Sequence, residues 1–172
     1  PASGTHLFGR DEECSQLRTV FDEAARGRGA SVVILGDGGI GKSSLLEALV
    51  AYAENAGALV LFGRTWEAER NLPFGPWVHA FHAAGVMPDF NAGLDAHSRR
   101  ELARLFPDLG APPDDAPAED HLPLFEAMAS AIRLVSSQGP LVVAIEDLHW
   151  ADEMTARLLA HLAHAVADCP VL

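Results

Sequence analysis

Residues 31–43, SVVILGDGGIGKS, decide the predicted fold because three local patterns follow one another within this short stretch. Residues 31–35 are a continuous apolar run rich in β-branched side chains, which is typical of a strand buried on both faces of a parallel sheet. A glycine-rich loop follows at residues 36–41, and a helical pattern then runs over residues 42–54. A strand, a glycine loop and a helix in this order predict the first unit of an α/β fold.

The loop and the start of the helix match the phosphate-binding pattern G-x-x-x-x-G-K-S/T. Glycines let successive main-chain N–H groups point into one concavity, and the first helical turn adds unpaired amides and a positive dipole end. In this pattern the lysine reaches the β- and γ-phosphates of a nucleotide, and the Ser43 hydroxyl ligates Mg²⁺. The predicted nucleotide-binding residues of this segment are Gly36, Asp37, Gly38, Gly39, Ile40, Gly41, Lys42, Ser43 and Ser44.

The composition supports a specific phosphate site and excludes a broad basic surface. Lys42 is one lysine among 12 basic residues, so a chain that otherwise uses arginine keeps lysine where the pattern requires it. The net charge of -12 argues against non-specific binding to nucleic acid or to an anionic membrane. Cys14 and Cys169 match neither a disulfide framework nor a thiolate metal site, and no apolar run reaches the roughly eighteen residues of a membrane span. We therefore expect a cytoplasmic protein that makes no membrane contact.

The rest of the chain alternates helical and strand patterns, which predicts a mostly parallel sheet with helices on both faces. The expected fold class is therefore a three-layer α/β sandwich in one domain, 1–172, with the sheet truncated on its C-terminal side. The chain starts at Pro1, so we expect an excerpt of a longer protein. The Pro- and acid-rich residues 107–120 indicate a surface loop. Helices are predicted from residue 11 to the glycines at 27 and 29, and over 76–84, 98–106, 123–137 and 152–166; strands are predicted over 58–62, 141–145 and 169–172.

Two carboxylates, Glu146 and Asp147, directly follow the predicted strand 141–145. Ligands bind at the carboxyl edge of open α/β sheets, so these side chains are expected to face the phosphate loop. One carboxylate can hold the metal, directly or through water, and the other can orient or deprotonate an attacking water. Asp152 precedes a helical run, so we predict that it is a helix N-cap in preference to a metal ligand.

Residues 145–152, IEDLHWAD, resemble the extended Walker B motif of STAND ATPases, the signal-transduction ATPases with numerous domains. The resemblance is strongest to the AAA-like ATPase module of large LuxR-type transcriptional regulators and to the modules fused to bacterial adenylate cyclases and kinases. Residues 8–12, FGRDE, are similar to the short box that precedes the phosphate loop in these proteins, and residues 63–74 also fit the family. The resemblance covers essentially the whole chain.

The resemblance implies a P-loop NTPase fold that binds ATP or ADP with Mg²⁺ and hydrolyses ATP slowly as a signalling or transcriptional switch. It places Lys42 on the phosphates, Glu146 with Ser43 at the Mg²⁺, Asp147 on the attacking water and Arg10 at the adenine end. Lys42, Glu146 and Asp147 would then be the catalytic residues, with hydrolysis weak or absent in this stretch. DNA would be contacted only through a domain outside these residues, and oligomerisation on activation stays open.

Two other functions stay open. A small-molecule kinase also uses a phosphate loop, with residues 74–120 as a substrate lid, and an interaction module can use bound nucleotide only for stability. A GTPase is disfavoured because its base-reading motif needs a second lysine. The pairs His79/His82 and His161/His164 have helical spacing but lack an evident third metal ligand, and the tryptophans are assigned to packing.

Overall fold

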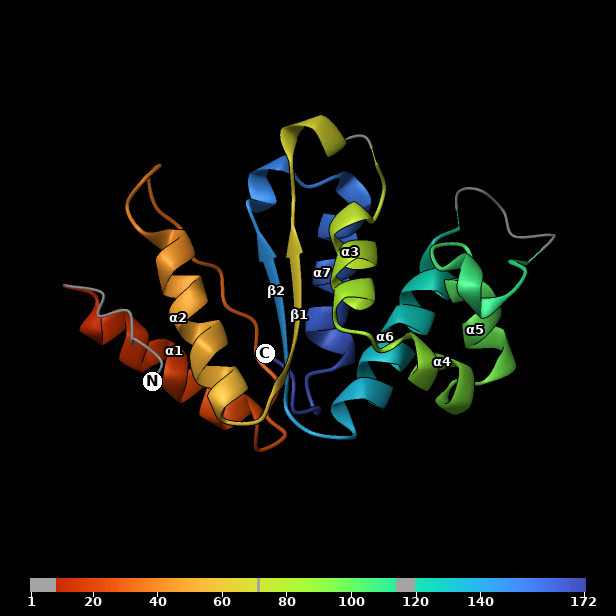
Figure 1. Cartoon of the computed structure of the whole chain (residues 1–172), viewed down its shortest axis with the longest axis horizontal. Coiled ribbons are helices and arrows are strands. Elements are labelled where there is room, and N and C mark those ends of the chain that lie inside the picture. Colours follow the sequence, from red (N-terminus) through yellow and green to blue (C-terminus); the bar gives the residue numbers. More distant parts are fainter. Residues whose placement is uncertain (1–8, 71, 114–119) are drawn as a thin grey trace.

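The computed structural model describes residues 9–70, 72–113 and 120–172 (Figure 1). Four residues used in the sequence analysis lie outside these ranges: Phe8 of the FGRDE box, and Asp114, Asp115 and Glu119 of the acid-rich loop. In chain order the helices and strands are α1 (Asp11–Ala24), α2 (Lys42–Asn55), β1 (Leu59–Arg64), α3 (Gly75–Ala83), α4 (Met87–Gly93), α5 (Ala96–Leu102), α6 (Leu122–Ser136), β2 (Leu141–Glu146) and α7 (Glu153–Ala165). Three single 3₁₀ turns follow strands or helices: η1 (Glu67–Glu69), η2 (Pro107–Leu109) and η3 (Leu148–Trp150).

The sheet of the described residues is a parallel pair of strands, β1 and β2. Their register runs from Leu59 opposite Leu141 to Arg64 opposite Glu146. Both arrows in Figure 1 point to the edge of the molecule that also holds the N-terminal end of α2. The fold is therefore mixed α/β with a small parallel sheet, and its carboxyl edge and the start of α2 lie at one end.

Helices cover both faces of this strand pair, because successive side chains of a strand point to opposite faces. Val142 and Ala144 pack in one core with α1 and α2, to which Leu17, Phe21, Leu45 and Leu49 belong. Leu141 belongs to the larger core on the other side, built mainly from the helices α3 to α7. Its largest fully buried side chains include Trp77, Phe81, Phe90, Phe106, Met128 and Ile132.

The predicted strand at residues 31–35 is wrong: the segment is an extended coil that leads into the loop. Val33 is 67% exposed and Leu35 is 86% exposed, so the apolar run is not buried. The Ala30 N–H donates to the Val171 carbonyl at 3.0 Å. β-branched residues form a strand only where a partner strand pairs with them, and no strand of the described residues pairs with 31–35. The predicted strand at 169–172 is reduced to one bridge between Val171 and Leu141.

The predicted helices are present, with boundaries shifted by a few residues and one addition. The pattern over 98–106 becomes α5, which begins earlier at Ala96 after its N-cap Asp95 and is followed by η2. The short helix α4 was not predicted, since Pro88 and Gly93 interrupt its pattern. Asp152 caps α7 as predicted. Among the described residues no helix is both long and apolar enough to cross a membrane.

Candidate functional site

The glycine-rich loop, residues 36–41, ends on the first turn of α2 and is mostly exposed (Figure 1). Gly39 has φ 76° and Gly41 has φ 96°, a left-handed conformation that glycine adopts without steric cost. Gly41 is the N-cap of α2 and has no side chain that could accept from the first-turn amides, which include that of Ser44. The loop therefore leaves the N-terminus of a 14-residue helix open to an anion.

The ammonium group of Lys42 lies against this loop. Its Nζ donates to the carbonyl oxygens of Gly36 at 2.9 Å and of Asp37 at 2.8 Å. An ammonium has three N–H donors, so two are used inside the loop and one is left for another acceptor. A positive charge and a set of unpaired amides thus stand at the same helix end, which suits a phosphate group.

Glu146 ends β2 and is 8% exposed, while Ser43 belongs to the first turn of α2. The Ser43 side chain is among the groups that lower the pKa of the Glu146 carboxyl, so the two predicted Mg²⁺ ligands lie near one another. Burial raises the pKa of the Glu146 carboxyl, but hydrogen bonds from Ser43 and Arg64 and the Arg64 charge outweigh it, and the pKa lies below its ordinary value. A hydroxyl and an ionised carboxylate are oxygen ligands of the kind Mg²⁺ prefers.

Arg64 is the part of this site that the sequence analysis did not single out. Its Nε donates to Oε2 of Glu146 at 2.7 Å, and its Nη2 donates to the same oxygen. The guanidinium also lies 5.4 Å from the centroid of the Trp66 ring. The signal in the sequence was positional: Arg64 and Glu146 are the last residues of two parallel strands, and the register places them opposite one another.

Asp147 is held in a strained conformation at the edge of the sheet. Its φ of 58° is left-handed, which is uncommon for a residue other than glycine. The buried Thr65 fixes it, because its N–H donates to the Glu146 carbonyl at 3.1 Å and its one hydroxyl hydrogen is shared between the carbonyls of Glu146 and Asp147. Backbone strain of this kind concentrates at functional sites, and here it leaves the Asp147 side chain exposed at the carboxyl edge.

Arg10 connects the start of α1 to the loop. Its Nη2 donates to the Ile40 carbonyl at 3.1 Å, and its Nη1 pairs with Glu13 at 2.8 Å. The pair with Glu13 orients the guanidinium toward the loop. Arg10 therefore lies beside the phosphate loop, while its predicted role at the adenine stays a prediction.

The histidine pairs acquire no metal-site geometry. In the described part of the chain no group of three or more His, Cys, Asp and Glu side chains is arranged to hold a metal ion. His161 instead faces Glu126, with Nε2 3.3 Å from Oε1, and its ring packs on Phe125. These contacts assign His161 to the packing between α6 and α7.

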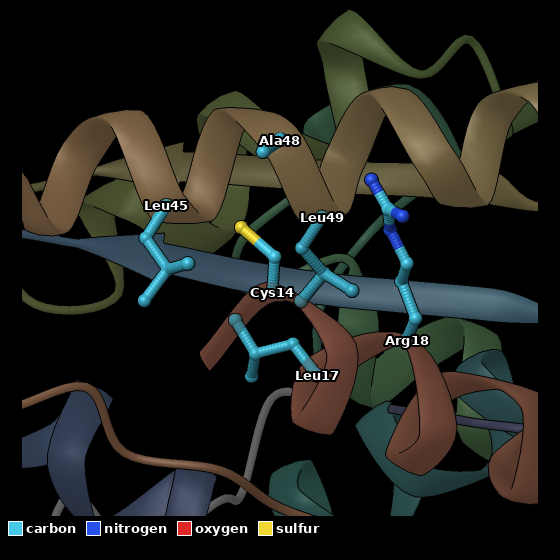
Figure 2. Close-up of a pocket in the computed structure, with 6 residues that line it drawn as sticks. All are labelled: Cys14, Leu17, Arg18, Leu45, Ala48 and Leu49. Carbon is cyan, nitrogen blue, oxygen red and sulfur yellow. The ribbon is translucent and has the colours of Figure 1, made fainter. Parts of the chain in front are cut away.

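A hollow between α1 and α2 lies apart from the loop (Figure 2). In Figure 2 the Cys14 side chain points toward α2, and Leu17 and Leu49 belong to the small core. Both Cys14 and Cys169 are free thiols. The hollow is a seam between two packed helices, and its lining residues are Cys14, Leu17, Arg18, Leu45, Ala48 and Leu49.

The family model of the AAA ATPase domain matches residues 6–172, nearly the whole chain. This chain belongs to the AAA ATPase domain family. The AAA ATPase domain is a nucleotide-binding P-loop module, and the mixed α/β fold with its small parallel sheet is consistent with that assignment. An uncharacterized protein of Rhizobium meliloti (strain 1021) is 28% identical over 186 residues, which cover 98% of this chain and 18% of that protein. No solved structure matches.

Proposed function

We propose that this AAA ATPase domain binds ATP with Mg²⁺ and acts as a nucleotide-dependent switch in a larger cytoplasmic signalling or transcription regulator. The nearness of Ser43 to Glu146, whose pKa it helps to lower, supports this most directly, because the start of α2 then lies beside the end of β2 at an open helix N-terminus. The chain spans 18% of its Rhizobium relative, so the output of the whole protein, including any DNA contact, belongs to this proposal.

Each side chain has a role in the proposed site. The loop amides and Lys42 hold the phosphates, and Ser43 and Glu146 hold Mg²⁺, which when bound neutralises phosphate charge. Asp147, exposed at the carboxyl edge, orients the attacking water. Arg10 fixes the loop through the Ile40 carbonyl and borders the base.

The proposed domain is one unit, 1–172: an entry segment and first helix (1–30), the loop unit (31–62), a helical insertion (63–121) and the acidic half (122–172). A three-layer sandwich is part of this proposal. Hydrolysis is expected to be slow or absent, because Lys42 is engaged by loop carbonyls. Slow hydrolysis suits a switch that must persist in its ATP state.

Thermal unfolding in the presence of Mg²⁺ and either ATP or ADP tests the proposal. A switch requires different affinities for the two nucleotides, so we expect both to raise the Tm and ATP to raise it more. Equal shifts without turnover would reassign the domain to the nucleotide-stabilised interaction module. Phosphate transfer to an added hydroxyl acceptor would reassign it to the kinase class, and no shift with either nucleotide would overturn nucleotide binding itself.

A further inference from the structure

The Glu146 carboxylate is already paired with a positive charge, the guanidinium of Arg64. Two N–H groups of Arg64 converge on Oε2 of its carboxylate. The two partners differ in burial, since the Arg64 side chain is 39% exposed and the Glu146 side chain is 8% exposed. A carboxylate buried to this degree is strongly disfavoured without a counter-charge, so Arg64 supplies what Glu146 needs when no other cation is near.

A metal ion at Glu146 would share its carboxylate with the guanidinium of Arg64. Two cations at contact distance repel one another, and a hydrogen-bonded carboxylate oxygen has fewer lone pairs left for a metal. Arg64 is the partner that can leave, because an arginine that is more than a third exposed loses little when it exchanges one ion pair for water. The Trp66 ring, 5.4 Å from the guanidinium carbon, offers it a second contact.

The backbone beside Arg64 keeps its place when the side chain moves. Thr65 is 4% exposed; its N–H donates to the Glu146 carbonyl, and its one hydroxyl hydrogen lies within reach of the carbonyls of Glu146 and Asp147. These bonds fix the end of β1 to the end of β2. An exchange at Glu146 therefore needs only a new rotamer of Arg64 and no shift of either strand.

We propose that Arg64 is a positioning residue for the metal: it holds Glu146 through Oε2 while the site lacks a divalent cation, and the cation displaces it toward Trp66. The inference rests on the proposed function for the arrival of Mg²⁺ with ATP. The pair of Arg64 and Glu146 thereby sets how strongly nucleotide binding depends on the metal.

Titration of the protein with Mn²⁺ alone, followed by electron paramagnetic resonance, tests the exchange without nucleotide. Arg64→Gln removes the competing charge, and we expect it to tighten Mn²⁺ binding about two- to fivefold, as for the loss of one partly exposed ion pair. Arg64→Lys keeps the charge but not the two converging N–H groups, so it should tighten binding by a smaller factor. If Arg64→Gln fails to fold, Arg64→Lys still tests the proposal.

A double-mutant cycle separates competition from a general effect of charge. Glu146→Gln should abolish the Mn²⁺ site, and adding Arg64→Gln to it should change nothing further. Equal Mn²⁺ binding in the wild-type protein and both Arg64 variants, or no binding in any of them, would overturn the proposal. Tightening that persists in the Glu146→Gln background would also contradict it, because Arg64 would then act through another group.

Trp66 provides a spectroscopic readout of the moving side chain. Mg²⁺ with ATP should change the tryptophan emission of the wild-type protein, and this change should be missing in Trp66→Phe and in Arg64→Gln. If ATP binds but Arg64→Gln changes neither the Mn²⁺ affinity nor the emission response, the exchange is refuted and the proposed function stands. Tighter Mn²⁺ binding in Arg64→Gln without any ATP binding would support the exchange and refute the proposed function.

Discussion

The N-termini of α2 and α7 differ in whether a side chain accepts hydrogen bonds from the amides of the first turn. Each helix begins with amides that have no acceptor inside the helix. At α7, Asp152 Oδ1 accepts from the Thr155 N–H at 2.8 Å, and Oδ2 accepts from the Thr155 hydroxyl at 2.6 Å. At α2 the N-cap is Gly41, which has no side chain. A helix end closed by its own side chain serves stability, whereas one left open by a glycine is suited to an external anion.

Removing the ammonium at the open end should have the largest effect on ligand binding. We expect Lys42→Ala to weaken ATP affinity ten- to hundredfold, because a charge-assisted hydrogen bond contributes about 1.5–3 kcal/mol. Thermal stability should change little, since Lys42 contacts only loop carbonyls. Calorimetric titration of both proteins checks this, and undiminished affinity in the variant would break the contrast between the two helix ends.

The backbone of the open end should resist a side chain. Gly41→Ala adds a Cβ that meets nothing within 4 Å, so its cost comes from the φ of 96° alone, about 1–2 kcal/mol of folding stability. Gly38→Ala is the matched control, because its Cβ also has open space and its φ is not left-handed. Urea unfolding should show a lower midpoint for Gly41→Ala only; equal midpoints would mean that the loop conformation carries no strain.

The closed end should show the reverse pattern of the open end. Asp152→Ala removes the cap of α7, and we expect a loss of about 1 kcal/mol in the free energy of unfolding with no change in ATP affinity. Urea unfolding and calorimetry on the same preparation measure both quantities. A loss of ATP affinity in this variant would place Asp152 at the metal and end the distinction drawn here.

The N-terminus of α5, capped by Asp95, gives the smallest expected effect on folding stability, and this effect depends on pH. Hydrogen bonds from the side chain and N–H of Ser98, and then from the His97 N–H, lower the pKa of Asp95, the N-cap of α5, below its ordinary value. A lowered pKa in the folded state means that this stabilisation is complete near neutral pH and is lost as the pH falls below about 4. Asp95→Asn should flatten that part of the stability curve, and an unchanged curve would contradict the assignment.

Local patterns predicted the helices well, because amphipathic spacing and caps such as Asp152 act within one or two turns. The strand at residues 31–35 failed because pairing is not local, and the same composition that favours a strand stays coil where no partner lies beside it. The pair of Arg64 and Glu146 was missed for a related reason. It joins residues 82 positions apart, and only the register of β1 on β2 brings them together.

The most direct test of the site is isothermal titration calorimetry of the folded protein with ATP in the presence of Mg²⁺. We predict saturable heat that corresponds to one nucleotide per chain. When Mg²⁺ is replaced by a chelator the affinity for ATP should fall, because Ser43 and Glu146 then lack the ion that joins them to the phosphates. No heat with ATP or ADP under either condition would contradict the assignment of the open end of α2 as a phosphate site.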